Sequence, residues 1–300
     1  MSEKLNVLGS SAIPEQGIEA LRERSAGALE QALEFVETQG NSLSKIRAHI
    51  LVELEPVASG LAWLAEHQSQ DGSLPDVCEV FPGWLERDLC GWDSGSEISG
   101  TLAAMSVLGD WKQFHDATGD RAIEFLRHAQ SSDGAFGESG GSETDSLMRV
   151  FATGMLAGFL GRTRSARPEI MQGAGRYLAG HWSVDFIRKQ PWPGVAAFAH
   201  YFTNVIDDEA EAALPWCSRE LERGKLAHEY SAGQVLRVLF YCEAEALPGV
   251  DFNTNGLLDH LLKEQLDDGS FGTSTDESGR IGETLDAMMF IMRLCRTGGQ

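Results

Sequence analysis

Basic residues are scarce in this sequence. Lysine and arginine together number 24, against 45 aspartate and glutamate residues, so the formal net charge at pH 7 is -21. A charge of this sign repels phosphate groups, which argues against nucleic acid and anionic membrane surfaces as partners. No apolar run approaches the roughly 18 to 20 residues of a membrane-spanning helix, and the first residues lack the pattern of a secretory signal.

Cysteine is also sparse. The five cysteines are scattered, and the sequence contains neither a CxxC pair nor an HExxH motif. An odd number of isolated cysteines favours free thiols in a reducing compartment over a disulfide framework. We therefore expect a cytoplasmic protein, whose oligomeric state the sequence leaves open.

No segment shows the period-two alternation of a half-buried strand. Segments 99–110, 145–161 and 282–294 are instead apolar on nearly every side, which is typical of buried inner helices. Segment 121–130 is amphipathic, like an outer helix, and 17–39 and 44–56 add a further helical pair at the N-terminus. These patterns predict an all-α protein of about six outer and inner helix pairs, which is enough to close a ring.

A short sequence motif occurs three times. Residues 68–74 read QSQDGSL, 130–137 read QSSDGAFG, and 265–272 read QLDDGSFG. Each follows an amphipathic segment and combines Gln with an Asp-Gly turn and an apolar residue, in which Gly supplies the positive φ of a tight reversal. The wide gap between the second and third copies predicts two degenerate copies, for which 175–186 and the stretch before 220–230 are candidates.

This repeat resembles that of terpenoid cyclases and protein prenyltransferase β subunits. The resemblance covers about residues 58–295 and implies a single (α/α)6 toroid, two concentric rings of helices around a cavity. One domain over 1–300 is expected, with a flexible N-terminus at 1–16 and a first helix pair at 17–57. The chain departs from the family repeat at its last position, where Leu74, Phe136 and Phe271 replace the usual Trp.

The resemblance implies a catalytic acid at the head of an inner helix. Class II terpene cyclases protonate an alkene with an Asp of a D-x-D-D-T-A motif. Glu143 and Asp145 are the best match, so Asp145 is the predicted proton donor and Glu143 its helper, while Glu97 keeps only the first carboxylate of the motif. Clustered carboxyl groups raise one another's pKa, as protonation of an alkene requires. The alternative is that these residues only cap their helices.

A zinc site is the second interpretation, and no cofactor is expected otherwise. Asp88 and Cys90 resemble the D-x-C ligand pair of protein prenyltransferases, and His228 is the best third ligand. Pro215-Trp216-Cys217 bears only a weak resemblance to the Trp-Cys motif of the zinc lanthionine cyclases. The acidic run 207–211 is interpreted as a solvated loop.

Aromatic residues crowd the segment 182–202. They predict an apolar pocket that stabilises a cation, although aromatics also fill ordinary cores. The substrate-binding candidates are Trp92, Trp182, Trp192, Phe198 and Tyr201. The leading prediction is therefore acid-initiated cyclisation or isomerisation of an apolar, isoprenoid substrate. The alternatives are a zinc-dependent prenyltransferase-like enzyme and a non-catalytic toroid that binds a lipid or a protein partner.

Overall fold

A computed structural model describes residues 15–75, 77, 96–137, 143–189, 191–243, 247–250, 252–272, 274 and 277–297. Within these residues the chain is helical and contains no strand, apart from one isolated antiparallel bridge between Gln265 and Phe271. The all-α prediction is therefore confirmed. None of the described helices combines the length and the apolar character that crossing a membrane requires.

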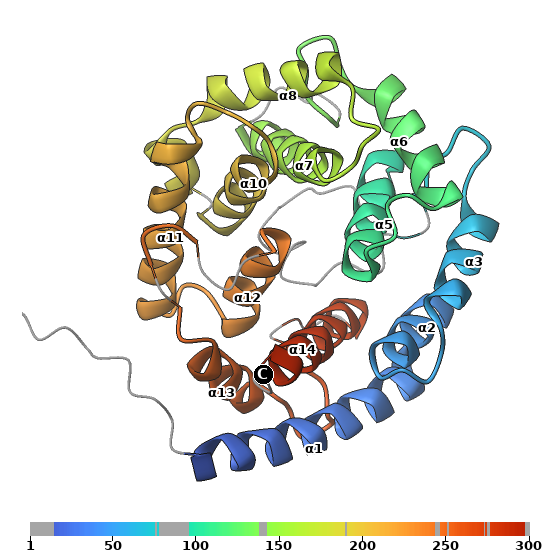
Figure 1. The fold of residues 1–300 in the computed structure, drawn as a ribbon, viewed down its shortest axis with the longest axis vertical. Coiled ribbons are helices and arrows are strands. Elements are labelled where there is room, and N and C mark those ends of the chain that lie inside the picture. The colour runs from blue at the N-terminus through green and yellow to red at the C-terminus, as the bar shows by residue number, and fades with distance from the viewer. Residues whose placement is uncertain are drawn as a thin grey trace, which may run out of the picture.

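Most of the helices alternate along the chain between an inner and an outer position. Figure 1 shows them following one another around a common centre, with α5, α7, α10, α12 and α14 on the inner side and α1, α3, α6, α8, α11 and α13 outside. Their bounds are α1 Glu15–Gln39, α2 Ser42–Leu51, α3 Val57–His67, α5 Glu97–Trp111, α6 Ala117–Ala129, α7 Glu143–Gly161, α8 Pro168–His181, α9 Val184–Lys189, α10 Pro191–Asn204, α11 Ala210–Leu226, α12 Ala232–Tyr241, α13 Thr254–Lys263 and α14 Glu277–Thr297.

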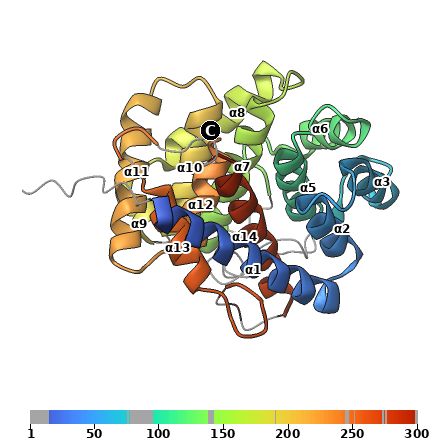
Figure 2. The ribbon, with the colours of Figure 1, turned by 60° about the horizontal axis from the view of Figure 1, so that its bottom comes forward.

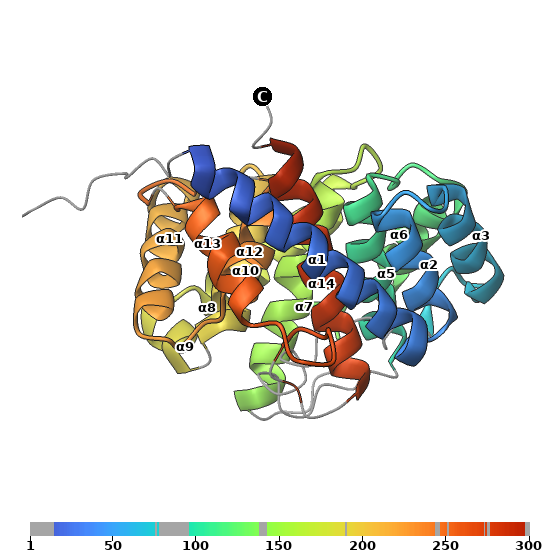
Figure 3. The ribbon, with the colours of Figure 1, turned by 90° about the horizontal axis from the view of Figure 1, so that it is seen from below.

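The first helix joins the two ends of the fold. Figures 2 and 3 show α1 running obliquely across α13 and α14 toward α2, and α1 contacts all three of these helices. The exposed ion pair between Arg24 and Asp259 lies along the α1–α13 contact, at 2.6 Å. An early segment of the chain thus packs against the last two helices.

Burial follows the predicted division into inner and outer helices. In α5 every residue from Ser99 to Gly109 is buried, so this helix meets other helices on all sides. In α6 the buried residues include Ile123, Phe125 and Leu126, while Arg121 and Glu124 are exposed. One boundary differs from its prediction: α2 ends at Leu51, and a turn with Glu53 at φ 63° leads to Pro56.

The glutamine of each repeated turn joins two outer helices. Its Nε2 donates to the glycine carbonyl of its own turn and to a carbonyl of the next outer helix. These second bonds are Gln68 to Thr118 on α6, Gln130 to Ile170 on α8, and Gln265 to Ala28 on α1, each of 2.9 Å. The third bond spans 237 residues and links α13 to α1, the last outer helix to the first.

The repeat also fixes each turn to an inner helix. The backbone N–H of its apolar residue donates to a threonine Oγ1, from Leu74 to Thr101 on α5 at 3.1 Å, from Phe136 to Thr153 on α7 at 2.9 Å, and from Phe271 to Thr284 on α14 at 2.9 Å. These three threonines therefore mark one common level on their helices. The repeat predicted from sequence is a connector between both layers.

Candidate functional site

The predicted acids lie at the beginning of inner helices, at different levels. Asp145 precedes Thr153 on α7 by eight residues, whereas Glu97 precedes Thr101 on α5 by only four. At 1.5 Å per residue, this difference corresponds to about 6 Å along the helix axis. Glu97 is exposed as the first residue of α5. The side chains of Glu143 and Asp145 lie outside the described residues, so their catalytic roles stay predictions.

The predicted aromatic residues divide into two groups. Trp182, Phe198 and Tyr201 pack where α10 faces α8 and α11: the Trp182 ring is centred 4.9 Å from that of Phe198 and 5.5 Å from that of Trp216. The Tyr201 hydroxyl donates to Asp207 at 3.0 Å. These contacts lie between the two layers of helices, so they account for the three side chains as core packing, and substrate binding by them stays a prediction.

Trp192 belongs to the inner side instead. Its indole Nε1 donates to the Gln234 carbonyl of α12 at 2.9 Å, and its ring lies 6.4 Å from that of Phe151 on α7. Trp192 is 1% exposed. It thus connects three inner helices, α7, α10 and α12. Trp92 lies outside the described residues.

The residues predicted for zinc are described only in part. Asp88 and Cys90 lie outside the described residues, and His228 is exposed just after α11, with a positive φ of 57°. Among the residues that are described, no group of three or more His, Cys, Asp or Glu side chains is arranged to hold a metal ion. Asp207 of the acidic run accepts from the backbone N–H of Glu209 at 2.9 Å. This local cap fits the interpretation of 207–211 as a loop.

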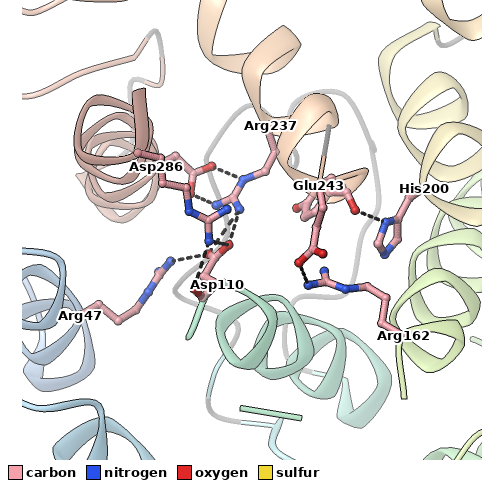
Figure 4. A network of polar contacts seen from close by, with 9 residues as sticks. Arg47, Asp110, Arg162, His200, Arg237, Glu243 and Asp286 are labelled. Carbon is pink, nitrogen blue, oxygen red and sulfur yellow. Dashed lines mark hydrogen bonds and ion pairs between the residues drawn. The ribbon is translucent and has the colours of Figure 1, made fainter. Parts of the chain in front are cut away.

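The structure reveals a buried ionic network that the sequence did not point to (Figure 4). Its centre is Arg237 on α12, whose side chain is 3% exposed. The Arg237 guanidinium binds Asp286 of α14 with two nitrogens, one of them Nε at 2.9 Å. Its Nη1 lies 3.2 and 3.3 Å from the two carboxylate oxygens of Asp110, at the end of α5. One arginine thus ties together three inner helices.

Two more arginines approach Asp110. Arg47 Nη2 on α2 lies 3.8 Å from the Asp110 carboxylate, and Arg293 Nη2 on α14 donates to the Asp110 carbonyl at 3.0 Å. The Arg293 guanidinium also lies 5.0 Å from the centre of the Phe240 ring, within the range of a cation–π contact. Asp110 is therefore shared by three guanidinium groups.

A second branch of the network lies beside the first. Arg162, which follows α7, pairs with Glu243, which follows α12. Nearby, the His200 Nδ1 lies 2.8 Å from the Tyr241 carbonyl, so Nδ1 carries the proton and donates it. His200 is fully buried, and burial lowers the pKa of His200 to about 3. His200 is therefore neutral at physiological pH.

Arginines outnumber carboxylates among the described residues of the network. Four arginines face three carboxylates, and one of these, Glu243, is half exposed. Burial lowers the pKa of the Arg47, Arg162 and Arg293 guanidinium groups, because the nearby carboxylates only partly offset the loss of water.

A cavity of about 570 Å³ adjoins the network. Its polar lining consists of three acidic residues, Glu53, Glu55 and Asp110, and one arginine, Arg293. The apolar lining consists of Ile50, Leu51, Leu54, Pro56, Val57, Trp111, Met289 and Met292. Its volume falls within the range of about 300 to 1,000 Å³ that small-molecule sites occupy.

A smaller cavity of about 30 Å³ lies between the beginning of α12 and α14. Three carboxylates contribute to its lining, those of Glu264, Glu283 and Asp286, together with the rings of Phe271 and Phe290. Glu264 accepts from the backbone N–H of Ala232 at 3.2 Å, and burial raises the pKa of Glu264. This volume holds about one water molecule.

Sequence reasoning missed these charged residues, although a signal was present. Arg237 is the only charged residue of α12, Asp110 stands at the apolar end of α5, and Asp286 immediately precedes the apolar run 287–292 of α14. A lone charge inside such a helix has to be paired, because an isolated buried charge is very unfavourable. Arg237 could therefore have been interpreted as one member of a buried ion pair.

His49, near the large cavity, gives the stability a dependence on pH. Its Nε2 lies 2.5 Å from Glu37 and its Nδ1 lies 3.0 Å from Glu55. The hydrogen bond with Glu55 raises the pKa of His49. The resulting stabilisation is complete below the ordinary histidine pKa of about 6.5 and is lost as pH rises through the raised value.

We expect His49→Gln to remove this dependence. Melting curves at pH 5.5 and pH 8.5 should show a larger gap between wild type and variant at pH 5.5. The matched control is His260→Gln on α13. A gap of equal size at both pH values would contradict the assignment to His49.

Comparison with known proteins gives no family: no protein-family model, curated protein or solved structure matches this chain.

Proposed function

We propose that the helices form a closed (α/α)6 toroid and that the chain is a terpene-cyclase-like enzyme. The element order supports five pairs of an outer and an inner helix, from α3 with α5 to α13 with α14, and α1 with α2 supplies the sixth pair of the proposed ring. The observation that carries the proposal is the Gln265 bond to the Ala28 carbonyl, because it repeats between α13 and α1 the link made at the two earlier turns. A closed ring requires this last link.

The proposed reaction is acid-initiated cyclisation or isomerisation of an apolar, isoprenoid substrate. Asp145, aided by Glu143, gives its carboxyl proton to an alkene carbon, where a C–H bond forms and a carbocation develops at the neighbouring carbon. Loss of a proton from the cation to a carboxylate restores the acid, so the reaction needs no redox partner. Trp192, buried among three inner helices, is the aromatic ring that would stabilise the cation.

The buried carboxyl groups of the small cavity support this choice. Glu264 and Glu283 lie next to Phe271 and Phe290 near the beginning of α12. Burial raises the pKa of Glu264 and so favours the protonated form of this carboxyl group, which is the form that acid chemistry requires. Ordinary surface carboxylates would be ionised and unable to protonate an alkene.

Product analysis after incubation with squalene or geranylgeranyl diphosphate tests the function. We expect cyclised or isomerised products of unchanged mass, and we expect Asp145→Asn to lower turnover by about 10² to 10⁴-fold. Glu211→Gln is the matched control, since Glu211 is an exposed acid of the outer helix α11 and should retain activity. Circular dichroism confirms that both variants fold.

Two results would contradict the proposal. Unchanged turnover in Asp145→Asn would show that Asp145 is not the acid that protonates the substrate. Zinc bound at one ion per chain, lost together with activity in Cys90→Ser, would favour the prenyltransferase-like centre of Asp88, Cys90 and His228 instead.

A further inference from the structure

His200 lies where three inner helices end. It stands one helical turn before the end of α10, and its Nδ1 donates to the carbonyl of Tyr241, the last residue of α12. Its ring packs edge-on against Phe159 near the end of α7, with 4.5 Å between the ring centres. The whole side chain is buried. One neutral imidazole therefore holds the ends of α7, α10 and α12 together.

The second ring nitrogen of His200 has no partner. Nε2 is buried and makes no hydrogen bond to any of the described residues. The backbone of α7 lies directly against this side of the ring, because a Cβ built on Gly158 would lie 2.3 Å from Cδ2 and 2.7 Å from Nε2. In the neutral ring Nε2 carries only a lone pair, whereas in the charged ring it would be a buried N–H donor without an acceptor.

The charged and titratable groups around the ring oppose its protonation. Arg162, just after α7, carries a positive charge close to the ring and is held there by Glu243 (Figure 4). At the end of α12 burial raises the pKa of Tyr241 and of Cys242 to about 12, so both are neutral. On α10 itself, the Asn204 amide lies 3.1 Å from Nδ1 and adds no charge. The Tyr241 carbonyl favours the charged ring, but the loss of water and Arg162 outweigh it.

We propose that His200 is an acid-sensitive latch, in which protonation of its ring is coupled to separation of the ends of α7, α10 and α12. A ring that is released into water takes up a proton below the ordinary histidine pKa of about 6.5, whereas the buried ring stays neutral. Because the native pKa is the lower one, the stabilisation is complete above about pH 6.5 and is lost as pH falls. Each pH unit below that value favours the opened form about tenfold, or about 30-fold at pH 5.0.

The latch is independent of the proposed cyclisation, because it uses none of the predicted catalytic acids. It also differs in sign from the effect of His49, whose raised pKa adds stability at low pH. A comparison of wild type with a His200 variant at the same pH isolates the latch, since His49 and the carboxylates are present in both proteins.

Urea denaturation at pH 7.5 and pH 5.0 tests the latch. His200→Asn keeps an amide donor for the Tyr241 carbonyl but cannot take up a proton. We expect the unfolding equilibrium constant to rise between pH 7.5 and pH 5.0 by about 30-fold more in wild type than in this variant. The matched control is His181→Asn, since His181 Nδ1 lies 2.9 Å from the Tyr177 carbonyl in a ring that is only partly buried. This control should keep the wild-type rise, and an equal rise in wild type and His200→Asn overturns the proposal.

A measurement on wild type alone decides the question even if His200→Asn does not fold. The chain has eight histidines. With ¹³C-labelled histidine, we expect one imidazole signal to stay unshifted between pH 7.5 and pH 5.0 while the chain remains folded. Amide exchange at pH 5.0, corrected for the chemical exchange rate, should accelerate at the ends of α7, α10 and α12 and not in α3. Eight titrating imidazole signals, or acceleration spread evenly over all helices, overturns the latch.

Discussion

Replacing Asp286 with alanine is expected to lower the free energy of unfolding by about 3 kcal/mol or more. The substitution leaves Arg237 buried with Asp110 as its one carboxylate partner among the described residues, and Asp110 is already shared with Arg47 and Arg293. The loss is large because the Asp286 side chain is 4% exposed, so water cannot replace the carboxylate. Urea denaturation followed by circular dichroism measures the effect.

Two further variants show whether the loss comes from an unpaired buried charge. Replacing both partners, in Arg237→Met with Asp286→Leu, should cost less than Asp286→Ala alone, since no orphaned charge remains in that pair. Asp259→Ala removes an exposed ion pair with Arg24 and should change stability by about 1 kcal/mol or less. An Asp286→Ala loss no greater than that of Asp259→Ala would show that the network is not held in a dry interior.

The repeated turns could be predicted from sequence because their chemistry is local. Asp71, Asp133 and Asp268 each accept from the backbone N–H two residues later, and the glycine that follows each Asp has a positive φ. These requirements produce the same recognisable sequence motif wherever the turn occurs. The inner helices could be recognised from the sequence for a similar reason, because a helix that is buried on all sides has no polar face.

The ionic network could not be predicted from the same kind of reasoning. Arg237 and Asp110 are 127 residues apart, and their contact depends on which inner helices meet across the centre of the fold. A sequence shows that a lone charge in an apolar helix needs a partner, but not which of several such charges will provide it. The network becomes visible only when its members are placed in space.

The sequence identified the aromatic residues of the candidate site, but not which way each of them faces. The aromatic segment 182–202 reads as one cluster, yet Trp192 faces other inner helices whereas Phe198 and Trp182 pack between the layers. Helical periodicity separates two faces of a helix, but both faces of α10 are buried and apolar. Composition therefore could not show which aromatics lie toward the interior of the fold.

The contact between the last outer helix, α13, and the first, α1, can be tested at one glycine. Gly269 has a φ of 84°, and a Cβ built on it would lie 2.4 Å from the Gln31 carbonyl oxygen of α1. We expect Gly269→Ala to destabilise the protein by about 2 to 4 kcal/mol, because it combines an unfavourable left-handed backbone with a clash against backbone atoms. Urea denaturation measures this loss.

The matched control lies on the other side of the same contact. Gly27 is exposed in the middle of α1, and a Cβ built on it meets nothing within 4 Å. Gly27→Ala should therefore stabilise the protein by about 0.5 to 1 kcal/mol, the helix-propensity difference between the two residues. Opposite signs for Gly269→Ala and Gly27→Ala would show that position, and not alanine itself, decides the outcome.

A third glycine distinguishes a closed ring from an open one. Gly134 has a φ of 92°, and its Cβ would lie 2.1 Å from the Gly173 carbonyl oxygen of α8, at a turn between consecutive outer helices. In a closed ring α1 is held as firmly as α8, so Gly269→Ala and Gly134→Ala should cost similar free energies. In an open arrangement α1 can move away from the turn, and Gly269→Ala should then cost clearly less. Comparable losses, with faster amide exchange in α1 only for Gly269→Ala, are the result that a closed toroid requires.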